Sequence, residues 1–498
     1  MQGSLFFITT MKKLLTTAIA LSFLIAASAQ SADDACRFAQ NQYHGTAKAL
    51  GMGNALGAVG GDMTAVCINP AGMGIYRSDE ITFSLNLLDN YSQSSYYGTD
   101  RGANKLRLTI PNLAYVGHKE RSNFKPLRST QFGIGLTRTN DYNMHLFARG
   151  INPTSSIIDN YLAQIDGYSV DELQDYFPNT VYPAWRTFLV DLYEDSQGAY
   201  YSSPVPQGGI WQSVENNFRG RSEEWSFAGS ANYYDRLFVG ISVNLAHITR
   251  TGERVKEESH PDGADPETGF NEWSFSEDLS SSGWGVNAKV GLIFHATSWL
   301  RLGAAFHSPT IYAFNETWQT ETESEISYVI RKYSSPESHY EYTFIKPLRW
   351  VGSMAFVVGQ QGMVSIDAEY TNYGAARFKA VADDDYDYTP TNEQIKETYG
   401  RTVNFRIGTE WDLNGTYLRM GAGYYGSPLG FGKTNGSVKT ASLGVSVPVS
   451  ADTSFDFAYE LAYSKHSFEL YDAGVLGIQP VTQRQFRNNL MTTLKVKF

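Results

Sequence analysis

The chain is dominated by a strict alternation of apolar and polar positions. Between Trp284 and Phe294 the even-numbered residues are all apolar, whereas the odd-numbered ones are mainly small or polar. A period of two is the mark of strands with two different faces. The pattern predicts about fourteen strands. They lie near residues 79–90, 105–118, 128–140, 221–233, 236–250, 283–295, 299–314, 339–358, 362–375, 400–411, 416–427, 437–449, 453–468 and 485–498.

Connection lengths decide between the two folds that this alternation permits. The apolar face would pack into a core in a β-sandwich, but it would face lipid in a membrane barrel. From the third strand onward, tight turns alternate with long connections, an arrangement typical of bacterial outer-membrane barrels. We therefore predict an all-β fold, a transmembrane antiparallel β-barrel with a large extracellular loop near 141–221. The tight turns fall at 234–235, 296–298, 359–361, 412–415 and 450–452.

The two ends of the chain carry signals of export and of membrane assembly. Met11–Lys13, the apolar stretch that follows and Ala27–Ala29 fit a secretory signal peptide, so residues 1–29 are expected to be a leader and signal peptide. After the leader, the sequence contains no run of about 18 apolar residues, the length that a membrane-spanning helix needs. The last strand alternates up to a terminal Phe498 and resembles the signal that barrel-assembly machinery recognises.

A glycine-rich stretch between the leader and the first strand predicts a plug. Eight of the thirty residues from Gly45 to Gly74 are glycine, so this backbone can fold tightly and lie close to a wall. A fourteen-stranded barrel leaves a lumen that water or a plug must fill. We expect residues 30–78 to form an N-terminal plug, or hatch, and residues 79–498 to form the barrel.

The only two cysteines, Cys36 and Cys67, both lie in this plug region. In an exported protein an isolated pair favours a disulfide. The alternative is that both thiols are free and buried.

Composition excludes several classes of function. The 51 acidic and 40 basic residues give a net charge of -11, so no basic surface for nucleic acid is expected. An aromatic fraction of 14% suits the aromatic girdles of a barrel. The chain contains neither G-x-S-x-G nor H-E-x-x-H, and Gly51, Gly53 and Gly57 miss the dinucleotide-binding spacing. We predict no enzyme, no cofactor and no metal site.

Four stretches resemble one family, the FadL/TodX-type outer-membrane transporters of long-chain fatty acids and other hydrophobic compounds. The stretches are ALGMGNALGAVGGDMTAVCINPAG in the plug, LRLGAAFHSPT at 300–310, FIKPLRWVGSMAFVVGQQGMVSIDAEYTNY at 344–373 and FRIGTEWDLNGTYLRMGAGYYGSP at 405–428. The resemblance covers nearly the whole mature chain. It implies a hydrophobic small-molecule ligand that binds from outside in an apolar pocket.

The resemblance also implies a route for release. The hatch would shift at the motif Asn69, Pro70, Ala71 and Gly72, and the ligand would leave sideways at a kink in the third strand. In this sequence Gly133 and Gly135 could bend that strand, and Pro111 could interrupt the second one, because proline donates no ladder hydrogen bond. Plain barrel bends are the alternative reading of all three residues.

A surface adhesin or receptor that binds partners through its long loops is the alternative function. A transporter should contain a continuous apolar cavity between the plug and the outer loops, whereas an adhesin should have a filled lumen. Either protein would contact outer-membrane lipid and lipopolysaccharide.

Overall fold

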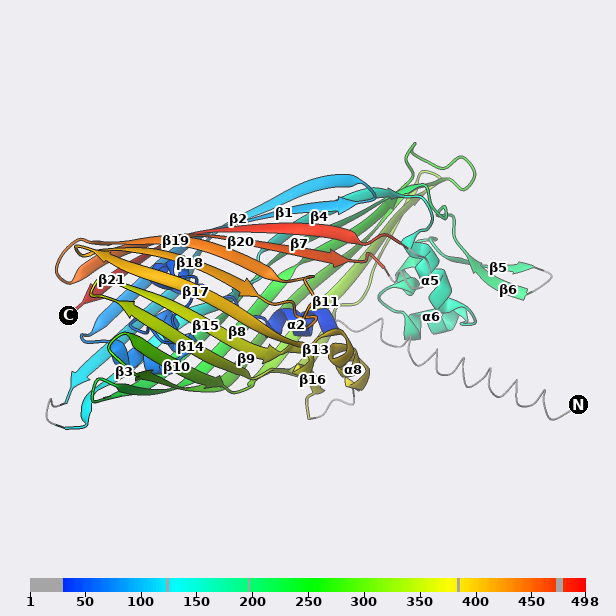
Figure 1. The fold of residues 1–498 in the computed structure, drawn as a ribbon. Helices are drawn as coiled ribbons and strands as arrows, with labels where there is room; N and C mark the ends of the chain where they lie inside the picture. The colour runs from blue at the N-terminus through cyan, green and yellow to red at the C-terminus, as the bar shows by residue number, and fades with distance from the viewer. Residues whose placement is uncertain (1–29, 122–124, 196–197, 383–385, 472–477) are drawn as a thin grey trace, which may run out of the picture.

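The computed structural model describes residues 30–121, 125–195, 198–382, 386–471 and 478–498. Its tilted strands form a long barrel with helices inside and at one end (Figure 1). The predicted leader, residues 1–29, lies outside the described residues. Within the described part of the chain, no helix is long and apolar enough to cross a membrane.

The wall is a closed antiparallel barrel of fourteen strands, as predicted. β1 pairs with β21 from Glu80↔Lys497 to Ser95↔Thr482, and this ladder closes the ring. Several wall strands are divided into two labelled segments. In order, the wall consists of β1 (Glu80–Tyr96), β2 (Thr99–Glu120), β3 (Leu127–Asp141) with β4 (Met144–Asn152), β7 (Ile210–Tyr233), β8 (Leu237–Ser259), β9 (Phe270–His295), β10 (Leu300–His307) with β11 (Thr310–Ile326), β13 (Ser338–Lys346) with β14 (Arg349–Val358), β15 (Gly362–Asn372) with β16 (Arg377–Ala380), β17 (Arg401–Leu413), β18 (Thr416–Tyr425), β19 (Val438–Pro448), β20 (Thr453–Phe468) and β21 (Val481–Lys497).

The alternation along the strands separates lipid from lumen. On β9, Trp284, Val286 and Val290 point outward and are exposed, whereas Asn287 and Lys289 point inward and are buried. An apolar outer face and a polar inner face are what a membrane barrel requires, the reverse of a soluble sandwich. The protein is therefore an outer-membrane barrel.

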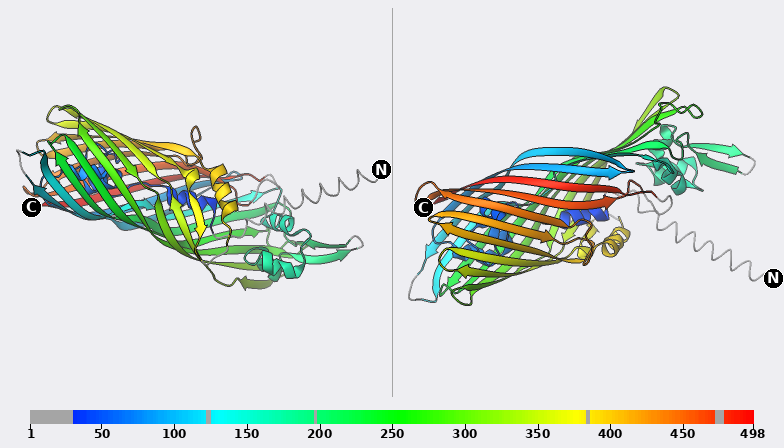
Figure 2. Two further views of the ribbon diagram at one scale, coloured as in Figure 1. Left: turned by 90° about the horizontal axis from the view of Figure 1, so that it is seen from below. Right: turned by 45° about the horizontal axis from the view of Figure 1, so that its top comes forward.

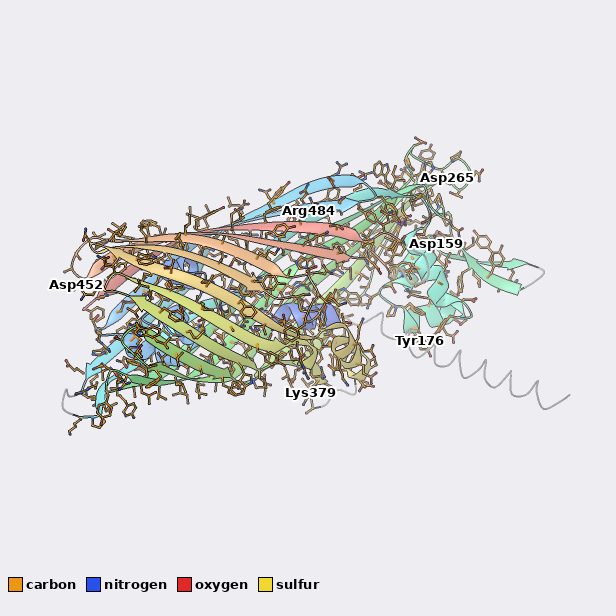
Figure 3. All side chains as sticks on the ribbon, in the orientation of Figure 1. Asp159, Tyr176, Asp265, Lys379, Asp452 and Arg484 are labelled. Atoms are coloured by element: carbon orange, nitrogen blue, oxygen red, sulfur yellow. The ribbon has the colours of Figure 1, made fainter. Side chains whose placement is uncertain are left out.

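Short turns and both ends of the barrel domain lie at the same end of the molecule. The turn between β7 and β8 places Tyr234 and Asp235 at φ values of 58° and 57°, which matches the twist of a two-residue hairpin. Phe498 N donates to Asp79 O, so the last residue meets the start of β1. Figure 3 labels Asp452 at this end and Asp159 and Asp265 at the opposite one. The role of Phe498 in assembly stays a prediction.

Four short helices of the plug lie inside the barrel (Figure 1), and each begins at a capping residue. They are α2 (Ala32–Ala39), α3 (Ala47–Gly51), α4 (Met63–Ile68) and the 3-10 helix η1 (Pro70–Ile75). The side chains of Ser31, Thr46, Asp62 and Asn69 each accept a backbone N–H from the first turn that follows. Such caps satisfy donors that a short helix cannot pair itself.

Buried charges on the inner wall hold the plug in place. Glu369 binds Arg349 at 2.6 Å and Arg406 at 3.0 Å, and Arg349 also donates to the Ala39 carbonyl of α2. Asp367 accepts the Gly57 N–H at 3.0 Å. Pairing of this kind offsets the cost of burying a charge. Inward charges of the wall thus pair with one another and with plug backbone.

The end of the barrel opposite the short turns carries a subdomain built from the long loop (Figure 1). It contains α5 (Ile157–Ile165), α6 (Val170–Tyr176), α7 (Val181–Arg186) and a projecting hairpin of β5 (Asp191–Asp195) and β6 (Gly198–Ser202) (Figure 2). Its helices share one apolar cluster with Phe270, Trp273 and Phe275 on the inner face of β9. The subdomain therefore packs onto strands β7 to β9, which continue well past their predicted ends.

One buried carboxylate docks this subdomain. Glu258, near the end of β8, accepts the Ile157 N–H and the Ser156 hydroxyl at the start of α5. It also accepts from Gln212 and from the indole N–H of Trp273. A carboxylate at a helix N-terminus is favourable because unpaired N–H groups point at it. The described chain also contains β12 (Val329–Ser334), which extends a hairpin from β11, the 3-10 helix η2 (Tyr373–Ala375) between β15 and β16, and α8 (Thr389–Thr398), which lies beside α2 (Figure 1).

Candidate functional site

A cavity of about 840 Å³ lies in the barrel above the plug. α2 forms part of its wall through Cys36 and Arg37. The long connections contribute Leu429 and Leu470, so the cavity borders the end of the barrel opposite the short turns, where the extracellular loops are predicted. It also borders the interruption between β3 and β4 in the third wall strand, where residues Asn140 to Met144 line it. One space thus connects the outer loops with an interruption in the wall.

Basic side chains are concentrated in this cavity. Arg250 is 2% exposed, stands 3.9 Å from the ring centre of Phe218, and lies 3.4 Å from Asp34 of α2. Arg254 and Lys256 follow on the same inner face of β8. The prediction of an apolar cavity is therefore wrong in part, because the lining of this cavity mixes apolar with charged side chains. The basic residues that line it are Arg37, Arg250, Arg254, Lys256 and Arg487, and the acidic ones are Asp33, Asp141 and Glu469.

An aromatic chamber adjoins the cavity, but α2 fills it. Phe38 stacks on Phe314 with ring centres 5.1 Å apart and meets Tyr142 and Phe344 edge-on at 6.0 Å. Arg37, one residue earlier, forms an ion pair with Asp34 on the same helix. Burial would raise the pKa of Asp34, but Arg37 and Arg250 outweigh this effect and hold the pKa below 3.8. The apolar part of the site is thus occupied by the plug itself.

The third wall strand breaks where it meets the plug. β2 and β3 pair from Glu120↔Ser129 to Asn112↔Thr137, and within the described residues this ladder goes no further. Beyond it, the plug takes the place of a neighbouring strand. The His44 N–H donates to the Arg138 carbonyl at 2.9 Å, and the Gln42 N–H donates to the Thr139 carbonyl at 2.7 Å.

Pro111 lies at this break, whereas the two glycines do not. Ile110 and Pro111 together stand opposite Leu85, a bulge directly beside the last β2–β3 pair. Gly133 and Gly135 lie in regular ladders with β2 and β7, and their role as kink residues stays a prediction. They also make room for the plug. A Cβ at Gly133 would come within 2.8 Å of Met73 Sδ, and one at Gly135 would come within 3.0 Å of Met63 Cε.

The hatch motif is locked to the wall. Asn69 is 1% exposed, and its amide donates to the Gly57 carbonyl at 2.7 Å and to the Leu292 carbonyl of β9 at 3.0 Å. Its side-chain oxygen accepts the Ala71 N–H at 3.1 Å. Glycine on the wall permits this close approach, since a Cβ at Gly291 would lie 2.0 Å from the Asn69 oxygen. The motif joins plug to wall; its movement stays a prediction.

The predicted disulfide is not formed. Cys36 and Cys67 are both free and buried, and they belong to separate apolar clusters. Cys36 packs with α2 against the aromatic chamber, where burial raises the pKa of its thiol to about 12. Cys67 packs at the foot of the plug near the Ser226 hydroxyl. The two positions are held apart because α2 and α4 dock onto different parts of the wall.

Sequence reasoning missed Arg250, Arg254 and Lys256. The pattern predicts a strand near residues 236–250 with a loop beyond it, whereas β8 continues to Ser259. The alternation could have located them, because these residues continue the even-numbered inner face that begins at Asn244. The many polar residues of this stretch made it resemble a loop instead. The end of the β2–β3 ladder at Thr137 had no local signal, since beyond it β3 pairs with the plug.

Fold and site together define a plugged outer-membrane barrel. Its cavity extends to an interruption in the third wall strand. No family model and no curated protein matches the sequence. Several solved structures share the fold. The Pseudomonas putida toluene transporter TodX is 13% identical with a TM-score of 0.54, over 92% of this chain and 100% of that one. A Pseudomonas aeruginosa FadL homologue is 12% identical with a TM-score of 0.57, over 92% and 99%. The Ralstonia pickettii toluene transporter TbuX is 16% identical with a TM-score of 0.52, over 91% and 98%. The resemblance found in the sequence is therefore confirmed at the level of the fold.

Proposed function

We propose that this protein transports hydrophobic molecules with an anionic head, such as fatty acids, across the outer membrane. The observation that carries the proposal is the cavity that joins the extracellular loops to the break in the third strand. Arg250, Arg254 and Lys256 supply cations for a carboxylate, which a neutral hydrocarbon would not need. The fold shared with hydrophobic-compound transporters supports the same class of ligand.

The proposed route begins at the outer loops beside Leu429 and Leu470. The head of the ligand binds the basic residues, and its chain displaces Phe38 from the aromatic chamber. Displacement of α2 then loosens the plug backbone that pairs with Arg138 and Thr139, because Gln42 and His44 follow α2 directly. Release is sideways through the wall beside Pro111. The motif Asn69–Gly72 keeps the periplasmic floor shut until the hatch moves.

Uptake and bound lipid test this proposal together. A strain that lacks the gene should take up radiolabelled oleate more slowly, and the intact gene should restore the rate. Mass spectrometry of a lipid extract from the purified barrel should detect a bound acyl amphiphile. Normal uptake in the deletion strain together with an empty extract would refute the proposal. A receptor that acts through its loops would need no cavity that reaches the wall.

A further inference from the structure

The wall overlaps itself beside the break in the third strand. Residues 99–111 of β2 pair with β1, and within the described chain they pair with no strand on their other side. β4 pairs with β7 and lies beneath the β1–β2 hairpin. Asn90 of β1 donates to the Asn143 carbonyl, and the Ser94 hydroxyl donates to the Phe147 carbonyl. The outer half of the hairpin, which we call the flap, thus covers β4.

One lysine fastens the free edge of the flap. Lys105 stands opposite Asn90 in the β1–β2 ladder, on the same inner face. Its Nζ donates to Asn217 Oδ1 and to the Phe218 carbonyl of β7, both at 2.6 Å. We call the unpaired junction between β2 and β4 the seam. Because β7 is the strand beyond β4, the Lys105 contact crosses the whole seam. We propose that Lys105 is the latch of the lateral exit, and that ligand leaves when the latch opens and the flap lifts.

The surroundings of Lys105 suit a latch that an anion can release. Leu106 and Leu108 on the opposite face of β2 are 59% and 70% exposed, as residues that face lipid are. Lys105 is only partly buried, and when its two hydrogen bonds break its ammonium group is left to pair with water or with another acceptor. A carboxylate head can supply that acceptor, so a passing anionic ligand substitutes for Asn217 and Phe218. A hollow of about 460 Å³ beside the latch is lined in part by Lys105, Arg107 and Arg219, together with the carboxylates of Glu253, Asp278 and Glu337.

The latch also contacts the cavity through a single residue. The Phe218 carbonyl holds Lys105, while the Phe218 ring lines the cavity beneath the Arg250 guanidinium. A ligand bound at Arg250 therefore lies against the residue that holds the flap. The latch rests on the proposed lateral release, but its opening can be measured without transport.

Thiol labelling tests the latch directly. In a background with Cys36→Ser and Cys67→Ser, a Ser94→Cys reporter lies under the flap, where Ser94 is 1% exposed. Adding Lys105→Met should speed maleimide labelling at this position about tenfold, the change expected when charge-assisted hydrogen bonds are lost. Thr82→Cys, at a position 2% exposed on the same strand but in the regular part of both ladders, should label at an unchanged slow rate. Unchanged labelling at position 94 would overturn the latch.

Cross-linking tests whether the flap must move. A short bifunctional maleimide that joins Lys105→Cys to Asn217→Cys should abolish oleate uptake. The same reagent across Ser92→Cys and Ala103→Cys, neighbours in the β1–β2 ladder, should leave uptake unchanged. Normal uptake through the flap cross-link would refute the latch while leaving transport intact. If the deletion strain itself shows normal uptake, the proposed function fails, and labelling at position 94 still decides whether the flap opens.

Discussion

Replacement of Asn69 by alanine should open the hatch without disturbing the barrel. The side chain makes three hydrogen bonds, two to carbonyls of the plug and of β9 and one from Ala71. At about 1 kcal/mol each, their loss destabilises the docked hatch by about 2–3 kcal/mol, since some carbonyls keep a second partner. Each 1.4 kcal/mol is about a tenfold change in an equilibrium. The open hatch should therefore become roughly 30- to 150-fold more populated.

The buried thiols provide the assay. Cys67 lies in α4 two residues before Asn69, and Cys36 lies in α2 near the cavity; both are buried. When opening is fast and labelling is slow, the alkylation rate follows the open population. Mass spectrometry of peptides should show Cys67 labelled roughly 30- to 150-fold faster in Asn69→Ala, in line with the population shift. Cys36 should change much less.

Asn86→Ala is the matched control. Asn86 is 2% exposed and donates to Asn489, so this variant also removes a buried amide but affects two wall strands and no plug residue. Its Cys67 labelling should match that of the parent protein. Equal Cys67 labelling in Asn69→Ala and the parent, with both barrels assembled, would show that the motif does not hold the hatch.

Three further predictions concern the wall, the ligand and pH. Gly291→Ala should speed Cys67 labelling, because its Cβ would lie 2.0 Å from the Asn69 oxygen, whereas Gly352→Ala, with no atom within 4 Å of its Cβ, should not. Arg250→Gln should weaken oleate binding to the purified barrel roughly tenfold, because the carboxylate loses a charged partner. Arg236→Gln, at the exposed short-turn end, should leave oleate binding unchanged. Equal binding by both variants would exclude Arg250 from the site. Because the pKa of Asp34 in the folded protein lies below 3.8, its contribution to α2 docking is fully present above that value and is lost as the pH falls through the lower folded pKa. The rate of Cys36 labelling, corrected for the pH dependence of the reagent, should therefore stay constant between pH 5 and 8. A rise in this rate within that range would contradict the role of Asp34 in docking α2.

Local pattern determined most of the architecture. Period-two alternation depends only on neighbouring residues, so it located the wall strands and their faces, and the short-turn residues supplied the hairpins. Capping residues such as Ser31 and Asp62 likewise begin the plug helices from local chemistry. The family resemblance then agreed with the fold because order and spacing of these elements are properties of the sequence.

Tertiary structure decided what the site contains. Cys36 and Cys67 stay apart because α2 and α4 dock on different parts of the wall, which no cysteine count reveals. The break beyond Thr137 forms because plug backbone replaces a strand there, and the bulge at Pro111 turns Lys105 toward the seam. These features depend on contacts between residues far apart in the chain. Sequence alone therefore determined a plugged outer-membrane barrel. Where this barrel has a cavity and a seam was determined only when its strands closed into a ring around the plug.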